Sequence, residues 1–186
     1  MTANKKITIL LSVILTQFLY SCVCHKSTHP GVIQYKNGAT YNQNICIKRN
    51  SYFAYVKVKD DNQNQFEKIY PELVQSVYSD EWKLVSLFFS EDKYGVDSHA
   101  FAKIIAGDII KLVYATYQIN TCNCKGQNMY VSNYFLINDN EKLLLNINDD
   151  EIVNKFEVVS FINNRSELIP DIDKMNIKLL SDFLNN

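Results

Sequence analysis

Glycine and proline are scarce in this 186-residue chain, which contains five glycines and three prolines. Loops that cradle phosphate groups need glycine, because their backbone must approach the ligand closely. No such loop occurs in the sequence, so a nucleotide site of that kind is excluded. We expect no cofactor.

A strong charge of either sign is also missing. The formal net charge is -1 at pH 7, and the lysines and arginines are scattered along the chain. Nucleic acids and anionic lipid surfaces are bound by basic residues gathered into a patch. We therefore expect no nucleic-acid partner.

No hydrophobic run is long enough to cross a membrane. The apolar stretch Ile7–Leu19 is about 13 residues long, whereas a spanning helix needs about 20. Lys5 and Lys6 precede the stretch, and Leu19-Tyr20-Ser21-Cys22 ends it. This order is typical of a secretory signal that is removed after export.

The leader resembles the signal peptide of bacterial lipoproteins, whose lipobox places an apolar and a small residue before a cysteine that becomes acylated. The resemblance covers the leader alone and implies lipidation of Cys22. Two or three acyl chains such as palmitate hold a protein on a membrane almost irreversibly. Val23 lacks the aspartate associated with inner-membrane retention, so an outer membrane is favoured if the host has two. An ordinary signal peptide, with Cys22 left for a disulfide, is the alternative.

The domain organisation follows from this leader. We expect a signal peptide over residues 1–21, a lipid-anchored tether over 22–30, and a single globular domain over 31–186.

Four further cysteines favour disulfides, because an exported protein meets oxidising conditions. They are Cys24, Cys46, Cys122 and Cys124. A direct Cys122–Cys124 bridge conflicts with disulfide geometry, so we expect each to pair with Cys24 or Cys46. Cys24 can also stay unpaired in the tether, and Cys46, Cys122 and Cys124 can instead serve metal or thiol-redox chemistry. The spacing matches no structural zinc pattern, so we assign no metal site.

The alternation of apolar and polar residues predicts an α+β fold with a mainly antiparallel sheet. The Asn37-Gly38 turn and the Met129–Ile137 and Lys142–Ile147 segments predict hairpins. A helix is expected near residues 66–78, because Ile69, Leu73 and Val77 recur every four residues.

The C-terminal part of the chain predicts further helices. An apolar face over Asp171–Leu184 predicts a C-terminal helix. Asp149 and Asp150 are expected to cap a short helix that runs through Phe156. The Val158–Ile162 segment suits either a helix or a strand.

Candidates for catalysis are few. His25 and His29 fall in the tether, so His99, in the run Asp97-Ser98-His99, is the one histidine expected in the domain. Neighbours in sequence seldom present their side chains to each other as a catalytic triad does. A hydrolase centred on His99 is therefore the third hypothesis, after a metal- or thiol-redox-active protein.

Tyrosines are numerous, and six of them lie on predicted strands, where alternation can expose a few together. They are Tyr52, Tyr55, Tyr114, Tyr117, Tyr130 and Tyr134. Exposed aromatic rings suit partner recognition. The leading hypothesis rests on export, lipid tethering, small size and the lack of a catalytic constellation. These features predict a non-enzymatic envelope lipoprotein that binds another protein, as an inhibitor or immunity factor or as an assembly accessory.

Overall fold

The structure, a computed structural model, describes residues 28–49, 52–60, 65–91, 96–120, 128–139, 141–162 and 174–186. The leader and Cys22, Cys24, Cys122 and Cys124 lie outside these ranges. His29 and Pro30, which we assigned to the tether, are the first two residues of strand β1.

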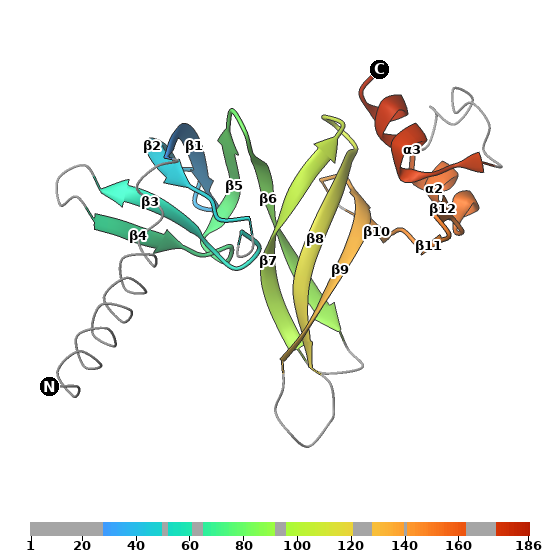
Figure 1. The fold of residues 1–186 in the computed structure, drawn as a ribbon, viewed down its shortest axis with the longest axis horizontal. Helices are drawn as coiled ribbons and strands as arrows, with labels where there is room; N and C mark the ends of the chain where they lie inside the picture. The colour runs from blue at the N-terminus through green and yellow to red at the C-terminus, as the bar shows by residue number, and fades with distance from the viewer. Residues whose placement is uncertain are drawn as a thin grey trace, which may run out of the picture.

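The described chain is built on one ten-stranded antiparallel sheet with two helices (Figure 1). Its strands are β1 (His29–Tyr35), β2 (Thr40–Cys46), β3 (Val56–Asp60), β4 (Gln65–Ile69), β5 (Val74–Ser79), β6 (Lys83–Glu91), β7 (Val96–Ala106), β8 (Lys111–Asn120), β9 (Asn128–Ile137) and β10 (Lys142–Leu144). A small hairpin of β11 (Ile147–Asn148) and β12 (Glu151–Ile152) precedes α2 (Lys155–Ile162), and α3 (Ile177–Leu184) ends the chain. The α+β prediction is confirmed.

The strand order is β10-β9-β8-β7-β6-β5-β1-β2-β3-β4. Every neighbouring pair joins consecutive strands except β5 and β1. At the β1–β2 turn Gly38 adopts a φ of +87°, and its N–H donates to the Tyr35 carbonyl at 3.0 Å. The predicted Asn37-Gly38 turn is thus confirmed, as is the hairpin of β9 and β10, in which Lys142 pairs with Ile137.

The expected helix over residues 66–78 is wrong. This segment forms β4 and β5, joined by a turn in which the Val74 N–H donates to the Pro71 carbonyl at 3.4 Å. Ile69 and Val77 are buried on separate strands, whereas Leu73 lies in the turn with 57% of its surface exposed. The apolar residues recur every four positions because one lies on β4, one in the turn and one on β5, and not because they share a helix face.

The expected helix after Asp149 and Asp150 is also wrong at its start. Both residues have positive φ values, 48° and 68°, in the two-residue turn between β11 and β12. The helix α2 begins later, at Lys155, and includes the Val158–Ile162 segment. The C-terminal helix is confirmed as α3, although it begins at Ile177 and the expected helix began at Asp171. The Asn176 side chain caps it by accepting a hydrogen bond from the Leu179 N–H at 2.9 Å.

Three apolar clusters hold the fold together. One lies among β1–β6 and the outward-facing Phe101 of β7, and a second packs α2 and α3 against Leu112 and Leu136. The third lies on the opposite, inner face of β6–β9 and contains Phe89, Val113 and Phe135 among others. Burial on both faces explains why β7 and β8 are apolar at most positions.

The β6–β10 part of the sheet curls around the third cluster. Four strand spacings separate β6 from β10 in the sheet order, or about 19 Å if the sheet were flat. Yet Lys142 Nζ on β10 donates to the Phe88 carbonyl on β6 at 2.8 Å and lies 4.2 Å from the centre of the Phe89 ring. The curl therefore brings β10 back to β6.

Candidate functional site

The candidate site is a strip on the outer face of β7–β9. Neither the N-terminal strands nor the helices α2 and α3 cover it. Along β7 the outward residue Phe101 is covered by the N-terminal strands, and the helices cover Leu112 and Leu136 at the other end. Between them the strands present four outward side chains: Lys103, Ile105, Tyr114 and Tyr134. Figure 1 shows the strands β7–β9 between β1–β5 on one side and α2 and α3 on the other.

Strand register brings the two tyrosines of the strip together. Tyr114 and Tyr134 are direct partners across β8 and β9, and their ring centres are 5.0 Å apart at an angle of 54°. Both are half-buried, and Ile105 beside them is 39% exposed. The strip therefore offers apolar surface to a partner.

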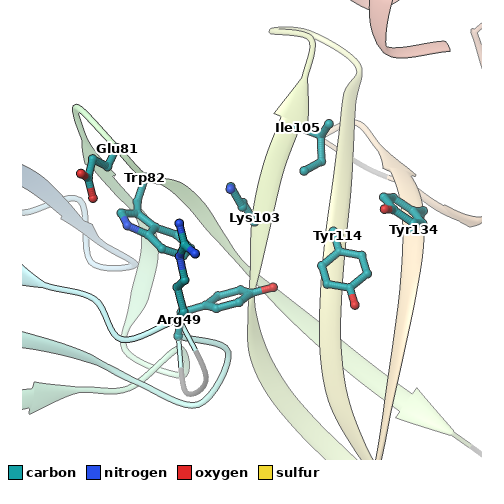
Figure 2. A pocket seen from close by; sticks show the side chains of 8 residues that line it. Arg49, Glu81, Trp82, Lys103, Ile105, Tyr114 and Tyr134 are labelled. Carbon is teal, nitrogen blue, oxygen red and sulfur yellow. The ribbon is translucent and has the colours of Figure 1, made fainter. Parts of the chain in front are cut away.

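A first cavity of about 600 Å³ opens over the strip toward the N-terminal strands (Figure 2). Its opposite wall consists of Arg49, Tyr52, Glu81 and Trp82. The Tyr52 and Trp82 rings are 5.4 Å apart, and Lys103 Nζ lies 4.9 Å from the centre of the Trp82 ring. Aromatic rings and two cations thus share one cavity.

A second cavity of about 550 Å³ lies on the helix side of the strip. Its lining comprises Ile105, Tyr134, Ile147, Asp150, Asn176, Ile177, Lys178 and Ser181. Ile105 and Tyr134 line both cavities, so the two are adjacent. We call the two adjacent cavities together the aromatic groove.

The charges of the aromatic groove come from its lysines, its arginine and its carboxylates, not from its tyrosines. Burial, with smaller effects from nearby groups, raises the pKa of Tyr52, so this phenol is neutral at physiological pH. Glu81, at the rim, is paired with His29 at 3.6 Å between Oε2 and Nε2. Neither Arg49 nor Lys103 forms an ion pair among the described residues.

The six tyrosines singled out from the sequence divide between the faces. Tyr52, Tyr114 and Tyr134 meet in the aromatic groove. Tyr117 points inward and stacks on Phe89 at 4.1 Å, while Tyr130 is 52% exposed and packs on Phe53. Tyr55 lies beside Tyr70, outside the groove. Arg49, Trp82 and Lys103 were not predicted as site residues, because they come from segments that only the folded sheet brings together.

No family model matches the chain, and no curated protein or solved structure matches it. Among the described helices none has the length and apolar character needed to span a bilayer. The features that bear on function are therefore the leader and the aromatic groove.

The cysteine predictions stay predictions. Cys46, at the end of β2, is buried, and its expected partners Cys24, Cys122 and Cys124 lie outside the described residues. Within the described part of the chain, no group of three or more His, Cys, Asp or Glu side chains is arranged to hold a metal ion.

His99 lines a separate cavity of about 360 Å³ together with Glu72 and Ser98. Its ring lies 5.0 Å from that of Phe88, on the neighbouring strand β6. Ser98 and His99 are consecutive in β7, so their side chains leave opposite faces of the strand. Ser98 Oγ is buried without a hydrogen-bond partner among the described residues. The hydrolase hypothesis stays a prediction.

Proposed function

We propose that this protein is a lipid-anchored lipoprotein of the bacterial cell envelope that binds a protein partner in the aromatic groove and performs no catalysis. The observation that carries the proposal is the groove itself. Its two parts, of about 600 and 550 Å³, fall within the usual size range of binding cavities. They are lined by aromatic and aliphatic side chains together with five charged ones, Arg49, Glu81, Lys103, Asp150 and Lys178. An inhibitor, an immunity factor or an assembly accessory would use such a surface.

The residues of the groove suit protein recognition for a physical reason. Tyrosine and tryptophan present a large apolar area and lose little conformational entropy when bound. Tyr114, Tyr134 and Trp82 are already packed against neighbours, so binding has few rotamers left to order. A partner can therefore cover this surface at a low entropic cost.

The start of β1 supports a site near the membrane. His29 contacts Glu81, a rim residue of the groove, and lies seven residues after Cys22. Seven extended residues reach at most about 25 Å. A lipid on Cys22 would thus hold the rim within that distance of the membrane surface, where a membrane-associated partner is accessible.

Site-specific photo-crosslinking in native cells tests the proposal. Tyr134→p-benzoylphenylalanine places the photoreactive ring on the floor of the groove. Tyr41→p-benzoylphenylalanine is the control, because Tyr41 is 53% exposed on β2, outside the groove. We expect an ultraviolet-dependent adduct with one protein from position 134 and not from position 41. No adduct, or equal adducts from both positions, would contradict the proposal.

A further inference from the structure

We infer that the aromatic groove takes an extended peptide segment that presents a carboxylate to Arg49 and Lys103 and an aliphatic side chain to Ile105 and Ile177. This inference rests on the proposed function and narrows the kind of partner surface that the groove recognises.

The shape of the groove favours an extended segment. Its two parts lie side by side over one strip of strands and share Ile105 and Tyr134 at their junction. A single compact side chain fills one part only. An extended chain places successive side chains about 6 to 7 Å apart on the same side, so one segment can fill both parts.

Charge complementarity defines the end of the groove near Trp82. Arg49 and Lys103 line it, and its one carboxylate, Glu81, is 59% exposed at the rim and contacts His29. The Lys103 ammonium is held over the Trp82 ring at 4.9 Å, so its position is set before a partner arrives. Two cations thus face the cavity in a chain whose formal net charge is -1. A carboxylate is the side chain that these cations attract.

Ring geometry argues against a carbohydrate occupant. Sugars stack on flat, open aromatic faces, but one face of Trp82 is occupied by the Lys103 ammonium. The Tyr52 and Trp82 rings are inclined by 42° and the Tyr114 and Tyr134 rings by 54°, so neither pair forms a flat platform. At the helix end the groove is lined by Ile105, Ile147 and Ile177, which suit an aliphatic side chain.

Selection from a phage-displayed library of random twelve-residue peptides against the full-length protein in detergent tests the inference. We expect the selected peptides to share one acidic residue at a fixed spacing from an aliphatic residue. Binding of one synthetic consensus peptide would then be measured by fluorescence anisotropy. Lys103→Glu should weaken it at least tenfold, or about 1.4 kcal/mol. Replacing the peptide's acid by lysine should restore binding to that variant.

Lys83→Glu is the matched control, because it changes the net charge equally on the neighbouring strand β6, outside the lining of the groove. It should leave the affinity within about twofold, since exposed charges interact weakly. The inference would be overturned by selected peptides that share no acidic residue. It would also be overturned if Lys103→Glu and Lys83→Glu weakened peptide binding equally, or if the protein bound a glycan array and selected no peptide from the library. A crosslinked partner from position 134 together with any of these results would leave the proposed function standing and remove only the peptide inference.

Discussion

Replacing Gly107 by alanine should destabilise the protein far more than the same change at Gly38, although the two glycines have nearly the same φ. Gly38 and Gly107 have φ values of 87° and 82°, a region that costs an alanine about 1 to 2 kcal/mol. A Cβ at Gly38 would meet nothing within 4 Å. At Gly107 it would overlap the Ile110 carbonyl oxygen and lie 3.4 Å from Leu184 Cβ. The difference between the variants therefore isolates the steric term.

The size of the steric cost at Gly107 depends on how far the backbone of Ile110 must shift to make room for the added Cβ. Overpacking of a well-filled site costs about 1 to 3 kcal/mol. The obstacle at Gly107 is backbone, and the turn is tied to the end of α3 by the Gly107 N–H, which donates to Asn185 Oδ1 at 3.1 Å. We expect Gly38→Ala to lower the free energy of unfolding by about 1 to 2 kcal/mol and Gly107→Ala by about 2 kcal/mol more.

Equilibrium unfolding in urea measures both variants. Trp82 is the only tryptophan, so its fluorescence reports on the wall of the aromatic groove while circular dichroism reports on the sheet. With a slope of about 2 kcal/mol per molar urea, the two midpoints should differ by about 1 M. Equal midpoints, or a larger loss in Gly38→Ala, would refute the steric reasoning and the placement of the β7–β8 turn against α3.

Lys142→Met should destabilise the protein by about 1 kcal/mol, because it removes the hydrogen bond from Lys142 Nζ to the Phe88 carbonyl. Burial lowers the pKa of Lys142, so the unfolded chain binds more protons than the folded chain between that pKa and 10.5. The free energy of unfolding of the wild type, relative to that of Lys142→Met, should therefore increase as pH rises through this window. A decrease would contradict the prediction. Burial raises the pKa of Tyr52, so stability should fall as pH rises from 10 through the folded-state pKa, and Tyr52→Phe should reduce that fall in urea midpoints. Asp149→Asn with Asp150→Gly should stabilise the protein by about 1 kcal/mol, because both positions have positive φ, and an unchanged melting temperature would count against the turn. Membrane-extracted protein should have the intact mass of residues 22–186 plus acyl chains minus four hydrogens, and Cys22→Ala should move to the soluble fraction; an unacylated native mass would remove the anchor.

Alternation made parts of the fold predictable from the sequence. It indicated the hairpin of residues 129–137 and 142–147. The Asn37-Gly38 pair marked its turn, because few other residue pairs adopt the positive φ values that such a turn requires. A spacing of four in residues 66–78 could not decide between a helix and two strands, because Val74 and Val77 are buried by pairing with a distant strand, β1. Secondary structure here was decided by tertiary contacts.

The candidate site was predictable only in part. The abundance of tyrosine indicated a recognition surface, but Tyr114 and Tyr134 share a cavity because of the β8–β9 register. Lys103 and Trp82 meet through the pairing of β6 with β7, and Arg49 arrives from the loop after β2. These three residues come from three distant segments, and none of them belongs to a sequence motif, so the sequence alone does not predict that they meet.

The strand order has a consequence for the folding kinetics. All pairings along the sheet except one join strands that follow each other in the chain, so they form from short loops and should appear early. The β1–β5 pairing joins Tyr35 to Val74, 39 positions later, and closing a loop of that length costs about 3 kcal/mol of chain entropy before any contact repays it. The rate-limiting step is therefore expected to be the docking of two preformed meanders, β1–β4 and β5–β10, along this single seam.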